Sequence, residues 1–143
     1  MLTAIEICYL LLPILSGTVA TAFCPMDKSA GENVKFRPPG WVFSIAWPVL
    51  YFCLGYSWII SSRESNLNVI PYSILTALLT LWIFVYSCQN SKKGGVYVLL
   101  VSIFAIFLCF SVGNKLSKLL LCPLIAWLIF AFLMNTTEVQ NLK

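Results

Sequence analysis

Five long apolar segments divide this chain, and they constrain its fold more than any other feature. They run over residues 4–24, 41–61, 69–88, 95–112 and 119–135. A helix needs about 20 apolar residues to cross a hydrocarbon core of roughly 30 Å, so each segment suits one crossing. Lipid cannot pair with backbone polar groups, which favours helices over other spanning structures. We therefore predict an all-α membrane protein, a bundle of five transmembrane helices forming a single domain over residues 1–143.

The composition leaves little material outside the bilayer. Hydrophobic residues make up 60% of the 143 residues and charged residues 10%, whereas a soluble domain is about half apolar and a quarter charged. The longest polar stretch, residues 25–40, is predicted to be the longest loop. The net charge of +4 comes from basic residues scattered over several loops, which argues against a nucleic-acid partner.

Histidine and cysteine usage narrows the chemistry. Histidine is absent, so the chain lacks the usual general base, the commonest metal ligand and the usual axial ligand of haem. The six cysteines are dispersed through the apolar segments without a C-x-x-C pair. We interpret them as small buried hydrophobic residues rather than as a metal site or a disulfide framework. We expect no catalytic or metal-ligating residue and no required cofactor.

The first apolar segment and the loop charges predict the orientation. This segment resembles a secretory signal near Ala20–Ala22, but Glu6 stands where a basic residue is expected, so we predict a retained helix. Five crossings place the two termini on opposite sides. Six basic residues fall in the first loop, the third loop and the C-terminus, against three in the other loops. The positive-inside rule then predicts that the first loop and the C-terminus are cytoplasmic.

Two helical stripes carry the candidate site residues. Trp47, Tyr51 and Trp58 recur at helical spacing in the second segment, which indicates either packing or a platform for a ligand. In the third segment Thr76 and Thr80 share an arc with Ser73, Ser87 and Phe84, and Trp82 lies opposite. We expect this hydroxyl face to look into the bundle. The alternative is that each hydroxyl only bonds back to its own helix.

Helix rise places residues of three segments at one depth. At 1.5 Å per residue, Trp47, Thr80 and Trp127 lie about 9 to 15 Å from the cytoplasmic end of their helices. This layer lies just beneath the long first loop and contains no charged residue. It predicts a largely apolar ligand, held by stacking and dispersion.

Two stretches of the sequence resemble the TspO/MBR family, the translocator proteins once called peripheral benzodiazepine receptors. The first is FRPPGWVFSIAWPVLY at residues 36–51, followed by Gly55 and Trp58, and the second is LLCPLIAWLIFAFLMN at residues 120–135. The resemblance implies a five-helix bundle with a ligand pocket beneath the first loop, lined by the second, third and fifth helices. It also implies dimerisation in some members, hence a possible homodimer here.

The resemblance carries over residue by residue at several positions. Trp47 and Trp127 match the family's pocket tryptophans, Pro39 and Trp41 the entry from the loop into the second helix, and Ala131 a small pocket residue. The paired asparagines of the family's third helix are replaced by Thr76 and Thr80, and the C-terminal cholesterol motif is missing. The candidate ligand-binding residues are Pro39, Trp41, Trp47, Tyr51, Thr76, Thr80, Phe84, Trp127 and Ala131.

The function that the resemblance implies is a membrane receptor or regulator. Its expected ligand is a porphyrin-like tetrapyrrole, with haem, sterols and isoquinoline or benzodiazepine-type drugs as further classes. The missing cholesterol motif favours tetrapyrroles over sterols. Three alternatives remain open: a passive transporter of tetrapyrroles or lipids, an enzyme that degrades porphyrin in light, and a scaffold for other membrane proteins.

Overall fold

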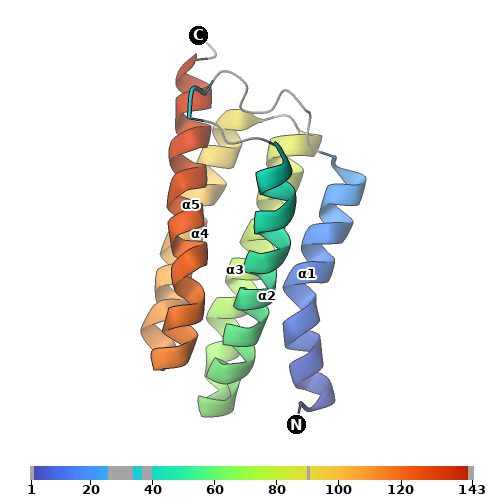
Figure 1. Cartoon of the computed structure of the whole chain (residues 1–143), viewed down its shortest axis with the longest axis vertical. Coiled ribbons are helices and arrows are strands. Elements are labelled where there is room, and N and C mark those ends of the chain that lie inside the picture. The colour runs from blue at the N-terminus through green and yellow to red at the C-terminus, as the bar shows by residue number, and fades with distance from the viewer. Residues whose placement is uncertain (1, 26–33, 37–39, 90, 142–143) are drawn as a thin grey trace.

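The computed structural model describes residues 2–25, 34–36, 40–89 and 91–141. Within these ranges it is a bundle of helices that alternate in direction along the chain, with no strand, and the two ends of the chain lie at opposite ends of the bundle (Figure 1). The helices are α1 (Ala4–Phe23), α2 (Gly40–Glu64), α3 (Val69–Ile83), α4 (Lys92–Val112) and α5 (Lys115–Asn141), with a 3₁₀ turn η1 (Asn66–Asn68) before α3 and a π-helical turn η2 (Phe84–Cys88) after it. Taken together, η1, α3 and η2 form one continuous span. This span and the helices α1, α2, α4 and α5 are each long and apolar enough to cross a membrane, which confirms the predicted fold class.

Local chemistry sets several helix ends. Thr3 and Glu6 form a capping box at the start of α1, and the Ser91 side chain accepts a hydrogen bond from the Gly94 amide at the start of α4. Such caps satisfy amide groups that the helix itself leaves unpaired. The last helix extends beyond the predicted segment, because it starts at Lys115 and continues to Asn141 rather than ending at Asn135. The polar C-terminal residues therefore prolong a spanning helix.

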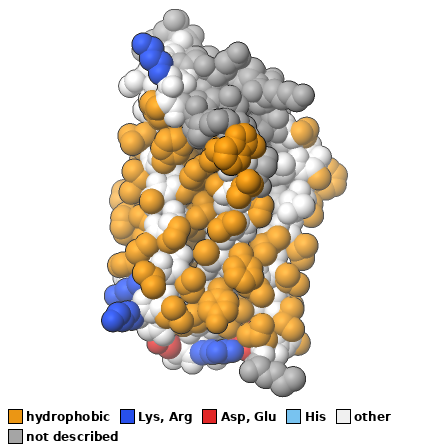
Figure 2. Space-filling view, in the orientation of Figure 1, with side chains coloured by type: hydrophobic (Ala, Val, Ile, Leu, Met, Phe, Trp, Pro, Cys, Tyr) orange, Lys and Arg blue, Asp and Glu red, His pale blue; other side chains and the backbone are white. Residues whose placement is uncertain are grey.

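The helices form a closed ring around a filled interior. Packed neighbours are α1 with α2, α2 with α5, α5 with α4, α4 with α3, and α3 with α1. Leu54, Tyr72, Leu99 and Leu128 are fully buried between them. Hydrophobic side chains also dominate the outer face, and basic groups gather near its ends (Figure 2). The outer surface of the bundle is apolar, as its interior is, which suits contact with lipid (Figure 2). Together with the five spans, this makes the chain an integral membrane protein.

Close contacts and buried hydrogen bonds fix the helices against each other. α1 and α2 approach so closely at Gly55 that a Cβ atom there would lie 2.5 Å from the Leu10 carbonyl oxygen. The Tyr72 hydroxyl lies 2.7 Å from Ser57 Oγ and 3.0 Å from Ser61 Oγ. Ser57 Oγ also donates to the Ser117 carbonyl. Small residues and hydroxyls hold helices together in lipid, where burial of apolar surface gives no net drive.

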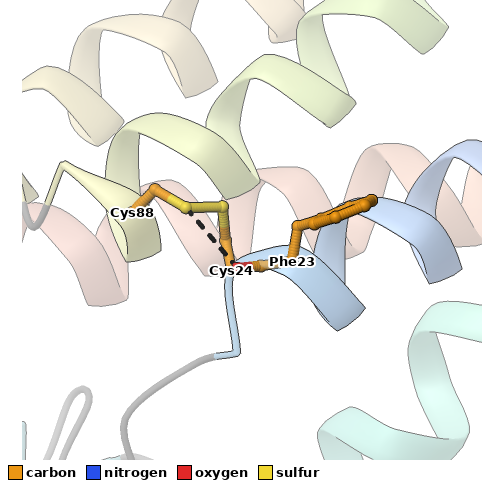
Figure 3. The surroundings of a disulfide bond; sticks show 3 residues. All are labelled: Phe23, Cys24 and Cys88. Carbon is orange, nitrogen blue, oxygen red and sulfur yellow. Dashed lines mark hydrogen bonds between the residues drawn. A yellow bond between two sulfur atoms is a disulfide. The ribbon is translucent and has the colours of Figure 1, made fainter.

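A disulfide bond corrects our interpretation of the cysteines. Cys24, just after α1, is bonded to Cys88, the last residue of η2, with 5.0 Å between the Cα atoms (Figure 3). The two positions are 64 residues apart, so spacing in the sequence could not reveal the pair. Cys109 is buried, as we predicted for all six, but Cys8 and Cys122 are exposed on the outside of the bundle.

Candidate functional site

Three tryptophans from three helices meet toward the first-loop end of the bundle. The ring centre of Trp47 on α2 lies 5.9 Å from that of Trp127 on α5 and 6.0 Å from that of Trp82 on α3. Tyr51 stacks beneath Trp47 at 5.5 Å. We call Trp47, Trp82 and Trp127 the indole cluster. The prediction that Trp47 and Trp127 share one depth is confirmed.

Further aromatic rings connect the indole cluster to the first loop. Phe43 and Phe130 each lie 5.6 Å from the Trp127 ring, and Phe36 contacts Phe130 edge to face at 5.9 Å. Phe36 belongs to the described part of the long first loop, beside the buried Val34. The described loop residues 34–36 therefore lie at the outer end of this aromatic layer, where a cover for a ligand would be needed.

The inward side of the third helix overlaps only in part with the hydroxyl face that we predicted, because Thr76 is buried as expected but Trp82 is buried as well. Trp82 is only 6% exposed, whereas Phe84 is 38% exposed and Ser73 lies on the surface. The hydroxyls of Ser73 and Thr80 donate to carbonyls one turn back, at 2.9 and 3.0 Å. A hydroxyl satisfied in this way gains little from the interior, whereas a large indole gains ring contacts there. The expectation of an inward hydroxyl face was therefore wrong for these two residues.

A group of polar side chains borders the indole cluster on its loop side. The Tyr86 hydroxyl donates to Glu138 Oε1 at 2.6 Å, and Lys92 Nζ lies 3.6 Å from the centre of the Tyr86 ring. The Tyr86 ring in turn stacks on Trp82 at 4.9 Å, and Asn135 Nδ2 donates to the Lys92 carbonyl. Our sequence reasoning missed Glu138 because it lies beyond the predicted end of the last apolar segment.

Several buried polar atoms in this region have no hydrogen-bond partner among the described residues. They include the indole N–H groups of Trp82 and Trp127 and the side-chain oxygen of Asn135. Most buried polar groups in proteins are paired, so this set marks a place where a bound molecule or a water can accept hydrogen bonds. An indole can only donate. A molecule bound here would therefore need acceptor atoms facing the two indoles.

A groove leads to the cluster from outside the bundle. It lies between α2 and α5, has a volume of about 610 Å³, and is lined by Ala46, Leu50, Trp127 and Phe130 among others. Small-molecule sites usually have volumes of roughly 300 to 1,000 Å³. Ile45 and Val49, which also line it, are more than half exposed. The groove thus opens sideways, toward lipid.

Comparison with known proteins identifies the relatives of this chain. The sequence profile of the TspO/MBR family matches residues 7–139. The chain belongs to the TspO/MBR family. It is 30% identical over 127 residues to the tryptophan-rich protein TspO of Archaeoglobus fulgidus, covering 84% of this chain and 83% of the relative. It is also 30% identical over 113 residues to protein CrtK of Rhodobacter capsulatus, covering 73% and 71%.

A third TspO/MBR relative is the tryptophan-rich protein TspO of Chlorobaculum tepidum, 29% identical over 117 residues, which cover 74% of this chain and 73% of the relative. Two of these relatives are named for their tryptophans. The present chain has five tryptophans, and three of them form the indole cluster. The fold thus brings Trp47, Trp82 and Trp127, which lie far apart in the sequence of this TspO/MBR protein, into contact.

The structure divides the predicted site residues of this TspO/MBR protein into separate groups. Trp47, Tyr51 and Trp127 lie together in or beside the indole cluster, and Ala131 is buried on α5 one turn after Trp127. Trp41 is 66% exposed on the outside of the bundle. Pro39 lies outside the described residues. The remaining three, Thr76, Thr80 and Phe84, line another groove, between α1 and α3.

Proposed function

We propose that this TspO/MBR protein is a membrane receptor or regulator that binds a porphyrin-like tetrapyrrole at the indole cluster. The observation that carries the proposal is the pair of unpartnered indole N–H groups, on Trp82 and Trp127, beside stacked aromatic rings. A tetrapyrrole has a flat aromatic plane for stacking and carboxylate or ring-nitrogen acceptors for the two donors. Binding favours metal-free rings, because the chain has no histidine to ligate iron.

The groove between α2 and α5 supports entry of this ligand from the bilayer. Trp127 belongs both to the groove and to the indole cluster, so a ligand lying in the groove already touches the cluster. Binding then requires the indoles, which contact each other, to move apart. Sterols and isoquinoline or benzodiazepine-type drugs are further candidate ligands of this apolar site.

Replacement of two cluster tryptophans tests the proposal. We expect the double variant Trp47→Ala/Trp127→Ala to bind protoporphyrin at least about tenfold more weakly, because two stacking surfaces are lost. The titration should follow the absorbance of the porphyrin itself, since the substitutions alter protein fluorescence. Trp41→Ala removes an exposed tryptophan from the same helix and should leave the affinity unchanged. Unchanged affinity in the double variant would overturn the site.

A passive transporter of tetrapyrroles or lipids is a second candidate, favoured by the sideways opening of the groove. In reconstituted vesicles it would give a protein-dependent flux of porphyrin, and a pure receptor would give binding without flux. Light-dependent degradation of bound porphyrin is a third. It would consume both porphyrin and molecular oxygen under illumination, in a way that depends on Trp47 and Trp127.

We also propose that the first loop and the C-terminus face the cytoplasm. The proposal rests on the excess of basic residues in the first loop, the third loop and the C-terminus. In this orientation the indole cluster lies nearer the cytoplasmic surface, and a ligand from the cytoplasmic leaflet has the shorter path to it.

A further inference from the structure

A second groove runs between α1 and α3, on a flank of the bundle that the proposed tetrapyrrole site does not use. Its volume is about 440 Å³, and its walls include Leu12 and Ser16 from α1, Thr80 from α3, Phe84 from η2, and Trp58 from α2. This volume also falls in the range of small-molecule sites. The hydroxyl stripe noticed in the sequence faces this groove.

Two polar groups in the groove wall have no hydrogen-bond partner among the described residues. They are the indole N–H of Trp58 and the hydroxyl of Thr76, although the two side chains are only 2% and 6% exposed. Other hydroxyls of the same groove are satisfied within their own helices. Ser16 donates to the Pro13 carbonyl at 3.2 Å, and Thr80 donates to the Thr76 carbonyl at 3.0 Å. The two unpaired groups therefore differ from their neighbours.

Packing holds the Trp58 indole in place. Its ring stacks on Tyr9 with 4.9 Å between centres and an angle of 11°, and it stacks on Tyr72 at 6.0 Å. The Tyr72 hydroxyl is bonded to Ser57 and Ser61. A ring held on both sides has little freedom to turn toward another acceptor among the described residues.

Both unpaired groups lie just inside the depth where a glycerolipid changes from polar to apolar. Trp58 is about 9 Å from the Glu64 end of α2, and Thr76 is about 10 Å from the Val69 end of α3. α2 has 25 residues and spans roughly 37 Å, a few ångströms more than the hydrocarbon core at each end. The two groups therefore lie about 5 Å inside the hydrocarbon boundary.

The groove continues from these two groups toward the middle of the membrane. Thr80 and Phe84 follow Thr76 at successive helical turns, and Leu12 and Ser16 form the facing wall on α1. Ser73, which also lines the groove, lies nearer the membrane surface and is exposed. A molecule matching this arrangement has one acceptor oxygen near the boundary and an apolar chain that follows the helix axis inward.

We propose that this groove binds one acyl chain of a membrane glycerolipid, with its ester carbonyl accepting hydrogen bonds from Trp58 Nε1–H and Thr76 Oγ1–H. A carbonyl oxygen has two lone pairs and can accept one hydrogen bond from each group. Inside lipid no water competes for these donors. The site is independent of tetrapyrrole binding, because it lies on another flank and uses other residues.

Retention of matched lipids tests this proposal. The protein is purified in mild detergent with either a diester or a diether phosphatidylcholine of equal chain length, and bound lipid is counted by native mass spectrometry. The diether lacks only the carbonyl oxygens. We expect the diester to be retained at least about fivefold better, because one hydrogen bond gives about this ratio and the carbonyl accepts two. Equal retention of the two lipids by the wild-type protein would overturn the proposal.

Two threonine variants assign the effect to the unpaired hydroxyl. Thr76→Val keeps the shape of the side chain and should reduce the preference for the ester, because only Trp58 Nε1–H remains to donate to the carbonyl. Thr80→Val is the matched control, because its hydroxyl lines the same groove but is already bonded, and it should keep the preference. An equal loss in both variants would contradict the assignment. Trp58→Phe provides a second test if Thr76→Val fails to fold.

The rival occupant is a second copy of the chain. A Ser73→Cys variant would then form a disulfide-linked dimer across the groove under mild oxidation, and neither lipid would be retained. This result would overturn the lipid proposal and assign the groove to a dimer interface. Tetrapyrrole affinity should remain unchanged in every groove variant, which separates this test from that of the proposed function.

Discussion

Tryptophan shows how position on a helix decides the role of a single residue type. Trp41 is exposed on the outside of the bundle, Trp58 is stacked between two tyrosines, and Trp47, Trp82 and Trp127 contact one another. The exposed indole suits the interfacial belt where tryptophans anchor helices. The indole N–H groups of Trp58, Trp82 and Trp127 have no hydrogen-bond partner among the described residues, which is costly in lipid unless a ligand or lipid accepts from them.

Gly55 provides a test of helix packing at the residue scale. Gly55→Ala should lower the stability of the bundle by about 1–3 kcal/mol, because the new methyl group collides with the backbone of α1 at Leu10. In an ordinary helix the same change would raise stability by about 1 kcal/mol. Thermal unfolding in detergent measures the difference, and a raised melting temperature would show that α1 and α2 do not approach so closely.

Residue-scale prediction succeeded where regular helix geometry applies. Trp47 and Trp127 could be placed at one depth from the helix rise alone, and their rings do meet. Trp82 could not be chosen over Thr80, because periodicity groups residues on one face without showing which face packs inward. That choice depended on the ring contacts of Trp82 with Trp47 and Tyr86, which no spacing rule contains.

At the scale of elements, the end of the third helix departs from regular geometry. The amides of Gln89 and Ser91 bond to the carbonyls of Phe84 and Val85, respectively, rather than to those four residues earlier. A π-helical turn of this kind changes the direction of the side chains that follow. The uniform rotation of 100° per residue that we assumed from the sequence does not hold at Ser87. For the same reason, the sequence could not show that Cys88 lies close enough to Cys24 to form a disulfide.

The disulfide gives a prediction for this same element. A reductant should lower the melting temperature of the wild-type protein, because Cys24–Cys88 closes a loop of 64 residues, and in chain-entropy terms this is worth up to about 4 kcal/mol. The double variant Cys24→Ser/Cys88→Ser should melt at the lower temperature and no longer respond to reductant. Cys8→Ser/Cys122→Ser alters two exposed free cysteines and should still respond. A reductant without effect on the wild-type protein would contradict the bond.

At the scale of the whole molecule, composition and segment length were sufficient to predict the fold class. Apolar segments long enough to cross lipid leave a helical bundle as the available solution. The order of helices around the ring was not predictable in the same way, nor were the two grooves. Both depend on which side chains interdigitate, and the outer and inner faces of each helix are similarly apolar, so the sequence pattern distinguishes them weakly.

Orientation in the membrane is the whole-molecule property on which two observations disagree. The basic residues of the first loop, the third loop and the C-terminus indicate that this end is cytoplasmic. The Cys24–Cys88 disulfide lies at the same end of the bundle, and disulfides rarely persist in a reducing cytosol. If this end is cytoplasmic, as the positive-inside rule predicts, the two cysteines are largely reduced in the cell and form the bond only under oxidising conditions.

A labelling experiment decides between the two orientations. Lys93 and Lys115 are exposed and lie at opposite ends of the bundle, so each can be replaced by cysteine and treated with a membrane-impermeant maleimide. In intact cells we expect Lys115→Cys to be labelled and Lys93→Cys to be protected until the membrane is opened, with the unaltered chain as the baseline. The reverse pattern would refute the cytoplasmic first loop. It would also place the disulfide and the nearer entrance to the indole cluster on the oxidising side, so that a tetrapyrrole would arrive from outside the cytoplasm.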